Sequence, residues 1–233
     1  MKRILTALMC LVAAFAFVRA AEPQRYLLDL KDFGEIKVTD GINVEWRCSA
    51  DSAGLVTFTT TPEMVTNIIL SNNKNCLRVQ LADTDWPLHH LPTLTVYSNF
   101  LGKAENSGDS TLVLQTPPPT AELKMRVVGN GTIIARGVHA TTVDAKIDTG
   151  NGRIVLQGTA QWVKLRSLGS GTIEAGELHA ENGSLQLAGT GSIDCWVTNE
   201  LTVKGLGSGK VYCKGDPKIK NRTLGTVDVI KVE

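Results

Sequence analysis

This sequence has few aromatic side chains and almost no net charge. It also has no long apolar run beyond residue 18. Aromatic residues make up 5% of the chain, and basic and acidic residues nearly balance at a formal net charge of +1. This balance argues against nucleic acid as a partner, because such binding depends on a clustered basic footprint. No later segment is apolar over the roughly 20 residues that a membrane-spanning helix needs. We therefore expect no transmembrane segment in the mature protein.

The first twenty residues have the layout of an export signal. Lys2 and Arg3 precede an apolar stretch that ends at Val18, and Val18-Arg19-Ala20 suits signal peptidase. Cleavage after Ala20 leaves 21 of the 24 basic residues against 23 acidic ones, a formal charge of −2. The sequence thus predicts a signal peptide over 1–20 and an exported protein of the periplasm, the outer-membrane surface or the extracellular space.

Glycine is abundant, with 22 residues in the chain, and a Gly-x-Gly motif recurs with a regular period in the second half. The chain reads GNGTIIA from 129, GNGRIVL from 150, GSGTIEA from 169, GTGSIDC from 189, GSGKVYC from 207 and a degenerate LGTVDV from 224. Taking the second glycine as origin, and Gly225 in the last copy, the repeats are 21, 19, 20, 18 and 16 residues apart. A period near twenty residues is typical of one coil of a solenoid.

Hydrophobic residues fall into columns when the repeats are aligned. Two residues after each origin the sequence has an aliphatic side chain, and polar side chains are tolerated one residue later, as alternation across a strand requires. A second strand precedes each Gly-x-Gly. The aligned aliphatic residues are Ile133, Ile154, Ile173, Ile193, Val211 and Val227. We predict an all-β, right-handed parallel β-helix over 93–233, with coils of about 20 residues.

The Gly-x-Gly corners have a steric explanation. A sharp bend between strands often needs positive φ, and coils about 4.8 Å apart leave no room for a Cβ that points along the stack. A phosphate-binding glycine loop would need a helix directly after it, whereas a strand follows each corner here.

The N-terminal part, 21–92, is predicted to form further strands stacked on the coils. Asp40-Gly41 lies between two alternating runs and favours a β-hairpin. A second turn is expected at the Asn-Asn-Lys-Asn segment 72–75.

Several of these segments together resemble a known family. The run Phe33-x-x-Ile36-x-Val38-x-Asp40-Gly41-Ile42-Asn43-Val44, the strand 94–97, the turn 107–109 and the Gly-x-Gly repeats resemble the head GIN domain family of auto-transporter adhesins. The resemblance covers about 33–229. It implies an exported β-helix-like protein, and the family offers no agreed catalytic residues to carry over and no cofactor.

A basic strip is the first candidate site. Six cationic residues occupy outward positions of the strands that precede the glycines, and stacking would line them along one face: Lys124, Arg126, Lys146, Lys164, Arg166 and Lys204. Such a face would bind an anionic glycan or lipid head group. The simpler interpretation is a charged surface that keeps a flat sheet soluble.

Two carboxylates form the second candidate site. Glu174 and Asp194 share one outward column in consecutive coils, which suits a shared cation or the acid and base of a polysaccharide-cleaving β-helix. Their column neighbours are Val155 and Tyr212, and no His or Arg stands in register to orient them. A solvated face is the alternative. Trp162 and Trp196 are expected to point outward or to corners, where they stack on a sugar ring or pack locally.

Four cysteines remain after the signal peptide, and their spacing contains no C-x2-C pair, so no metal site is predicted. Export permits disulfides. Cys195 and Cys213 share an inward column, and Cys48 and Cys76 end and begin neighbouring strands, so each pair is a disulfide candidate, with buried free thiols as the alternative.

These observations favour a non-catalytic, adhesin-like or envelope interaction module. Its partner is expected to be an anionic glycan, a surface protein or a second copy of the chain. A carbohydrate-active enzyme that uses Glu174 and Asp194, and a purely structural envelope component, are the alternatives. A concave site would favour the enzyme.

Overall fold

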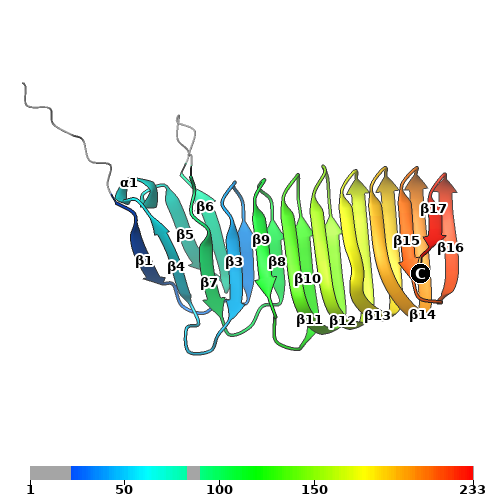
Figure 1. Cartoon of the computed structure of the whole chain (residues 1–233), viewed down its shortest axis with the longest axis horizontal. Helices are drawn as coiled ribbons and strands as arrows, with labels where there is room; N and C mark the ends of the chain where they lie inside the picture. Colours follow the sequence, from blue (N-terminus) through cyan, green and yellow to red (C-terminus); the bar gives the residue numbers. More distant parts are fainter. Residues whose placement is uncertain (1–21, 83–89, 233) are drawn as a thin grey trace, which may run out of the picture.

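The computed structural model describes residues 22–82 and 90–232, so the predicted signal peptide lies outside the described residues. The chain forms one long stack of β-coils, which runs from the blue end to the red end in Figure 1. This confirms the predicted all-β solenoid. No helix in the described ranges is long and apolar enough to cross a membrane.

The strands of the first half are short. One helix, α1 (Pro62–Val65), interrupts them. The strands are β1 (Gln24–Asp29), β2 (Glu35–Val38), β3 (Val44–Cys48), β4 (Leu55–Thr60), β5 (Ile68–Asn73), β6 (Cys76–Leu81), β7 (Leu94–Ser98), β8 (Lys103–Asn106) and β9 (Thr111–Gln115).

The strands of the second half are β10 (Thr120–Val127), β11 (Thr132–Ile147), β12 (Arg153–Gly169), β13 (Thr172–Gly189), β14 (Ser192–Gly207), β15 (Lys210–Lys214), β16 (Lys218–Gly225) and β17 (Asp228–Lys231). Four of them, β11 to β14, are long enough to run down one side of the solenoid and up the other.

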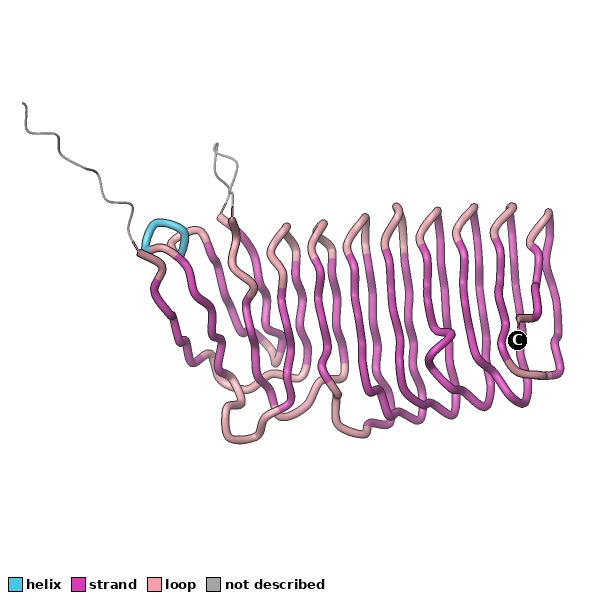
Figure 2. Tube along the Cα trace, viewed as in Figure 1, coloured by secondary structure: helices cyan, strands magenta, loops and turns pink. Residues whose placement is uncertain are grey.

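Parallel pairing arranges these strands into two walls. The first wall contains β6, β2, β8, β10, the C-terminal halves of β11 to β14, and β16. The second wall contains β7, β3, β9, the N-terminal halves of β11 to β14, β15 and β17. Turns join the walls along the upper edge of Figure 2, whereas at the lower edge of the second half the long strands β11 to β14 bend from one wall into the other. The apolar core fills the space between the walls.

The isoleucine ladder is confirmed. Ile133 pairs with Ile154, which pairs with Ile173 and then Ile193, and all four side chains are fully buried. The predicted second strand ahead of each Gly-x-Gly also forms, and it turns alternate apolar residues inward: Leu123, Met125, Val127, Val143, Ala145, Ile147, Val163, Leu165, Leu185, Leu187, Leu201 and Val203.

The predicted register of the last coil is wrong by two residues. Val211 pairs with Val229, not with Val227, and Gly225 pairs with Gly207. Gly225 therefore corresponds to the first glycine of the motif. This copy keeps a single glycine, and the sequence alone does not say which of the two positions it fills.

The two glycines of each corner meet two different requirements. The first has a positive φ, such as 127° at Gly169 and 125° at Gly189, which glycine adopts without steric cost. The second has no space for a side chain, because a Cβ on Gly191 would lie 2.2 Å from the carbonyl oxygen of Gly171. This close approach continues back along the stack to Gly108, whose Cβ would lie 2.2 Å from the oxygen of Asp40.

The hairpin predicted at Asp40-Gly41 does not form. β2 pairs with β6 and β8, whereas β3 pairs with β7 and β9. The two strands lie in opposite walls, so the Asp-Gly turn is a coil corner like the later Gly-x-Gly corners. By contrast, the predicted turn at 72–75 does join the antiparallel pair β5 and β6, with positive φ at Lys74 and Asn75.

The Gly-Ile-Asn segment forms hydrogen bonds with the coils on both sides of its own coil. Ile42 is fully buried, and the Asn43 side chain accepts a hydrogen bond from the Thr111 amide at 2.9 Å. The Asn43 carbonyl accepts another from the Leu94 amide at 3.0 Å. These contacts reach the coils on both sides of β2–β3, so strand pairing continues across residue 92 in both walls.

Antiparallel strands cover the N-terminal end of the stack. β1 pairs with β4, β4 with β7, and β5 with β6. These pairings occupy the edges of β6 and β7 that would otherwise stay open to another chain. Caps of this kind are usual where a solenoid ends.

We expect Ile173→Ala to lower the free energy of unfolding by about 2–5 kcal/mol, because the coils above and below hold the backbone and limit collapse of the cavity. Chemical denaturation of the mature protein measures this. A decrease in unfolding free energy below about 0.5 kcal/mol, typical of surface substitutions, would contradict the burial of Ile173 in the isoleucine ladder.

Candidate functional site: the two polar walls

The first wall carries the predicted basic strip. Arg126, Lys146 and Arg166 stand in register on β10, β11 and β12, and Lys204 continues the row two coils later. Lys124 and Lys164 belong to the neighbouring row, with Asp144 between them. The structure therefore brings these residues together on one wall.

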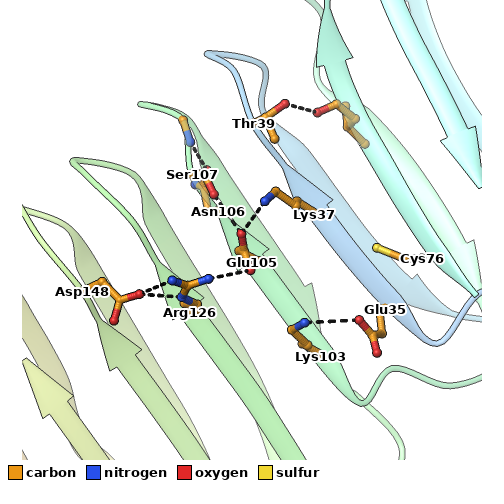
Figure 3. A network of polar contacts seen from close by, with 12 residues as sticks. Glu35, Lys37, Thr39, Cys76, Lys103, Glu105, Asn106, Ser107, Arg126 and Asp148 are labelled. Carbon is orange, nitrogen blue, oxygen red and sulfur yellow. Dashed lines mark hydrogen bonds and ion pairs between the residues drawn. The ribbon is translucent and has the colours of Figure 1, made fainter. Parts of the chain in front are cut away.

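Carboxylates neutralise the N-terminal part of this strip. Glu105 on β8 pairs with Lys37 Nζ at 2.7 Å and with Arg126 Nη1 at 3.4 Å. Asp148 pairs with Arg126 and Lys146, as the close-up in Figure 3 shows for Arg126. Arg166 binds Asp144 at 2.8 Å, and Lys124 binds Glu122 at 2.8 Å. The expected continuous positive face is reduced to Lys164 and Lys204, which form no ion pair within the described ranges.

The ion pairs lower the pKa values of the two central carboxyl groups. Burial raises the pKa of Glu105, but hydrogen bonds from Lys37 and Ser107 and the charges of Lys37 and Arg126 outweigh it, so the net pKa is lowered. Burial also raises the pKa of Asp148, and Lys146 and Arg126 together outweigh it. This ladder of alternating charges holds β2, β8, β10 and β11 in register.

An exposed tryptophan stands beside the uncompensated lysine. The side chain of Trp162 is 47% exposed on β12 and occupies the row between Thr142 and Asn182. Lys164 follows two residues later, and so it points to the same side of the strand. Trp162 thus points outward, as the sequence predicts.

The second wall contains a hollow of about 680 Å³ over the two predicted carboxylates. β13 causes it: Ala175 pairs with Cys195, but the next pair is His179 with Trp196, so three residues of β13 have no partner on β14. This bulge is visible as a kink in the strand trace of Figure 2. Bulges commonly re-aim side chains next to functional sites.

Glu174 and Asp194 pair in register as predicted, and both border the hollow. Contrary to the sequence-based expectation, an arginine does orient one of them. Arg153 Nε and Nη2 donate hydrogen bonds of 2.7 Å to the two oxygens of Glu174. Arg153 stands opposite Thr172, two residues along the strand from the column of Val155 and Glu174, and its length lets it reach the Glu174 carboxylate.

Asp194 is half-buried, and its carboxylate forms no hydrogen bond or ion pair in the described part of the chain. Burial raises its pKa, the charge of Glu174 raises it further, and Lys214 opposes both. Lys214 lies 3.8 Å from Glu177 and 5.7 Å from the ring centre of Trp196.

Trp196 packs locally at the bulge. Its ring lies 3.7 Å from the ring of His179, centroid to centroid. This contact, together with Lys214 on its face, favours the local-packing interpretation for Trp196, whereas Trp162 remains accessible.

All four cysteines in the described residues are free thiols. Cys195 and Cys213 are in register and buried, as expected. The contact with Cys213, and after it burial, raises the pKa of Cys195. The Cys195–Cys213 disulfide stays a prediction. Cys48 lies on β3 and Cys76 on β6, in different walls, so strand pairing does not bring the second predicted pair together.

The sequence analysis did not identify three residues that shape the two walls: Glu105, Arg153 and Gly176. Glu105 lies ahead of the Gly-x-Gly repeats, and Arg153 stands outside the carboxylate column. Gly176 belongs to the bulge, for which the uneven spacing of the repeats was a weak signal. Within the described ranges, no group of three or more His, Cys, Asp or Glu residues is suited to hold a metal ion.

We expect Glu105→Gln to destabilise the fold by about 1–2 kcal/mol at neutral pH, because the chain of ion pairs from Lys37 to Asp148 loses its central charge. Since the folded-state pKa of Glu105 is lowered, its stabilisation is complete above the ordinary pKa of about 4.3 and is lost as the pH falls through the folded-state value. Denaturant titrations at neutral pH and about pH 3 test this. Glu181→Gln, an exposed site without an ion pair, is the matched control. Equal effects of the two variants would contradict the role.

Asp194→Asn should act in the opposite direction. Because the folded-state pKa of Asp194 is raised, its charged form destabilises the fold above that pKa, and the penalty disappears as the pH falls towards the ordinary value of about 3.9. The variant should therefore melt at a higher temperature than the wild type at neutral pH, and the two should converge in acid. Asp228→Asn on the same wall is the control. A lower melting temperature for Asp194→Asn would overturn this assignment.

The comparisons with known proteins agree on the fold. A "putative adhesin" from Bacteroides fragilis is similar over 91% of this chain and 97% of its own, with 22% identity and a TM-score of 0.83. A "putative lipid binding protein" from Parabacteroides distasonis has 19% identity and a TM-score of 0.74 over 91% and 97% of the two chains. A "putative adhesin" from Parabacteroides merdae has 18% identity and a TM-score of 0.70 over the same shares. At these identities the likeness shows the fold alone.

The sequence itself matches a family over most of its length. No curated protein matches it. The family described as "Putative auto-transporter adhesin, head GIN domain" matches residues 32–217, which include the Gly-Ile-Asn corner and the Gly-x-Gly repeats. The chain therefore belongs to the head GIN domain family, as its resemblance predicted.

Proposed function

We propose that the protein is an exported, non-catalytic adhesin-like module that binds an anionic glycan on its first wall, at Trp162, Lys164 and Lys204. The adhesin names of the family and of its structural neighbours support the general role. The sequence of residues 1–20 supports export.

The observation that carries the proposal is the exposure of Trp162 on a rigid, flat sheet. Trp162 is 47% exposed, so its ring is accessible to a partner. Its ring offers a broad apolar face for stacking, and its edge keeps a polar group. Lys164 beside it supplies a positive charge that no carboxylate neutralises in the described residues.

The surface beyond Trp162 continues in the same chemical character. β13 contributes Asn182, Ser184 and Gln186, which are uncharged and able to hydrogen-bond, between Lys164 and the coil of Lys204. Coils are about 4.8 Å apart, so two coils span about 10 Å along the stack, a length that a short oligosaccharide covers. No acidic residue lies in this β13 row.

The Glu174 and Asp194 pair is the basis of a second candidate, a carbohydrate-active enzyme. The hollow above these residues is the concave site that such an enzyme needs. However, Arg153 engages both oxygens of Glu174, and a carboxylate held in this way is a poor nucleophile. This geometry favours binding over catalysis.

A binding assay with a heparin hexasaccharide tests the proposal, with maltohexaose as the neutral probe. We expect the wild type to bind heparin with an affinity that falls with salt, because exposed charges are screened over about 8 Å at physiological ionic strength. Trp162→Ala and the double variant Lys164→Gln/Lys204→Gln should each weaken binding by about tenfold, which corresponds to about 1.4 kcal/mol.

Lys210→Gln is the matched control, because Lys210 is exposed on the second wall and forms no ion pair in the described part of the chain. Arg126 and Arg166 are unsuitable test positions, since both form ion pairs with carboxylates of the first wall. Unchanged heparin binding by both first-wall variants, or equal binding of maltohexaose, would refute the proposal.

A further inference from the structure

The hollow on the second wall has a defined charge and shape, independent of the first wall. β12, β13, β14 and β15 each contribute to its lining. Its volume of about 680 Å³ is within the range of small-molecule sites. Val155 and Tyr212 provide apolar surface, and Gln157 adds an amide at the rim.

Of the carboxylates that line the hollow, one forms no ion pair in the described residues. Arg153 is committed to Glu174 through two hydrogen bonds, and Lys214 lies close to Glu177 and over Trp196. Asp194 is then the group whose charge is least compensated, because Lys214 influences it only at a distance. The hollow thus carries a net charge of one negative unit, located on its half-buried floor.

The bulge keeps the space above Asp194 open. Gly176 lies beside it, and a Cβ added to Gly176 would meet nothing nearer than the Asp194 Cβ at 3.9 Å. A side chain at position 176 would therefore fit without backbone strain and would fill the hollow. The glycine at this position leaves a space that the fold itself does not require.

A bound metal ion does not suit this arrangement. Calcium takes six to eight oxygen ligands, and no group of three or more acidic, His or Cys side chains converges in the described residues. A single available carboxylate in a wide, partly apolar hollow instead suits an organic ligand with one ammonium group. Gln157 and Tyr212, whose side chains form no hydrogen bond within the described ranges, are positioned to bind hydroxyl groups.

We infer that the hollow binds a sugar residue carrying a free amino group, with its ammonium on Asp194 and its ring against Tyr212 and Val155. The ammonium donates a charge-assisted hydrogen bond to a carboxylate that otherwise has none, and such bonds are roughly twice as strong as neutral ones. A lysine side chain of a partner protein has the same charge but lacks the ring hydroxyls that Gln157 and Tyr212 would bind.

Calorimetric titration with a β-1,4-linked glucosamine trimer tests the inference. The fully N-acetylated trimer has the same ring and linkage without the charge, and it should bind at least about tenfold more weakly, a difference of about 1.4 kcal/mol. Asp194→Asn should lose a similar factor, and Asp228→Asn, an exposed carboxylate on the same wall outside the hollow, should bind like the wild type.

Gly176→Leu provides a second, steric test, and should abolish trimer binding while its melting temperature stays close to that of the wild type. If the N-acetylated trimer binds equally well, or if Asp194→Asn binds like the wild type, the inference is wrong. Tighter binding of a tri-lysine peptide than of the glucosamine trimer would also overturn it. Heparin binding by Asp194→Asn should be unchanged, so failure here is distinguishable from failure of the first-wall proposal.

Discussion

The structure depends on how closely one coil can approach the next at the glycine corners. An added Cβ would lie 2.2–2.6 Å from the carbonyl oxygen of the preceding corner at Gly108, Gly131, Gly171, Gly191 and Gly209, and at Gly152 it would lie 2.5 Å from the Val127 side chain. Strand pairing in both walls and the contact between successive core residues require this spacing. A larger residue at any of these second glycines would separate the coils locally and open the ladder on both sides.

The fixed spacing also explains how the chain tolerates so much charge on its walls. Rows of side chains repeat every coil, so like charges can accumulate, as they do where Arg126, Lys146 and Arg166 stand in register. Carboxylates beside this row, Asp148 and Asp144, compensate these charges through ion pairs. Where such ion pairs end, at Lys164 on one wall and at Asp194 on the other, the surface has charge that the fold does not use. The two candidate sites are these two places.

The sequence predicted the parts of the fold that follow from periodicity. The isoleucine ladder and the outward direction of Trp162 depend only on strand alternation and on the motif, so both could be located. The path of β2 and β3 could not, because Asp40-Gly41 suits a hairpin and a coil corner equally, and the pairing partners lie some forty to seventy residues away. The hollow could not be predicted either, since a three-residue bulge in β13 appears in the sequence only as a slightly uneven spacing of the repeats.

The position of the β2–β3 coil has a consequence for folding. Its neighbours on the two sides are β6–β7 and β8–β9, so one face stays uncovered until residues up to about 98, and the other until residues up to about 115, have been synthesised. Each coil after β8–β9 stacks on the coil just before it in the sequence and can add by local propagation. Closing the early coil requires contacts between distant segments, which form slowly. We therefore expect the β2–β3 coil to close more slowly than the Gly-x-Gly coils, although it precedes them in the sequence.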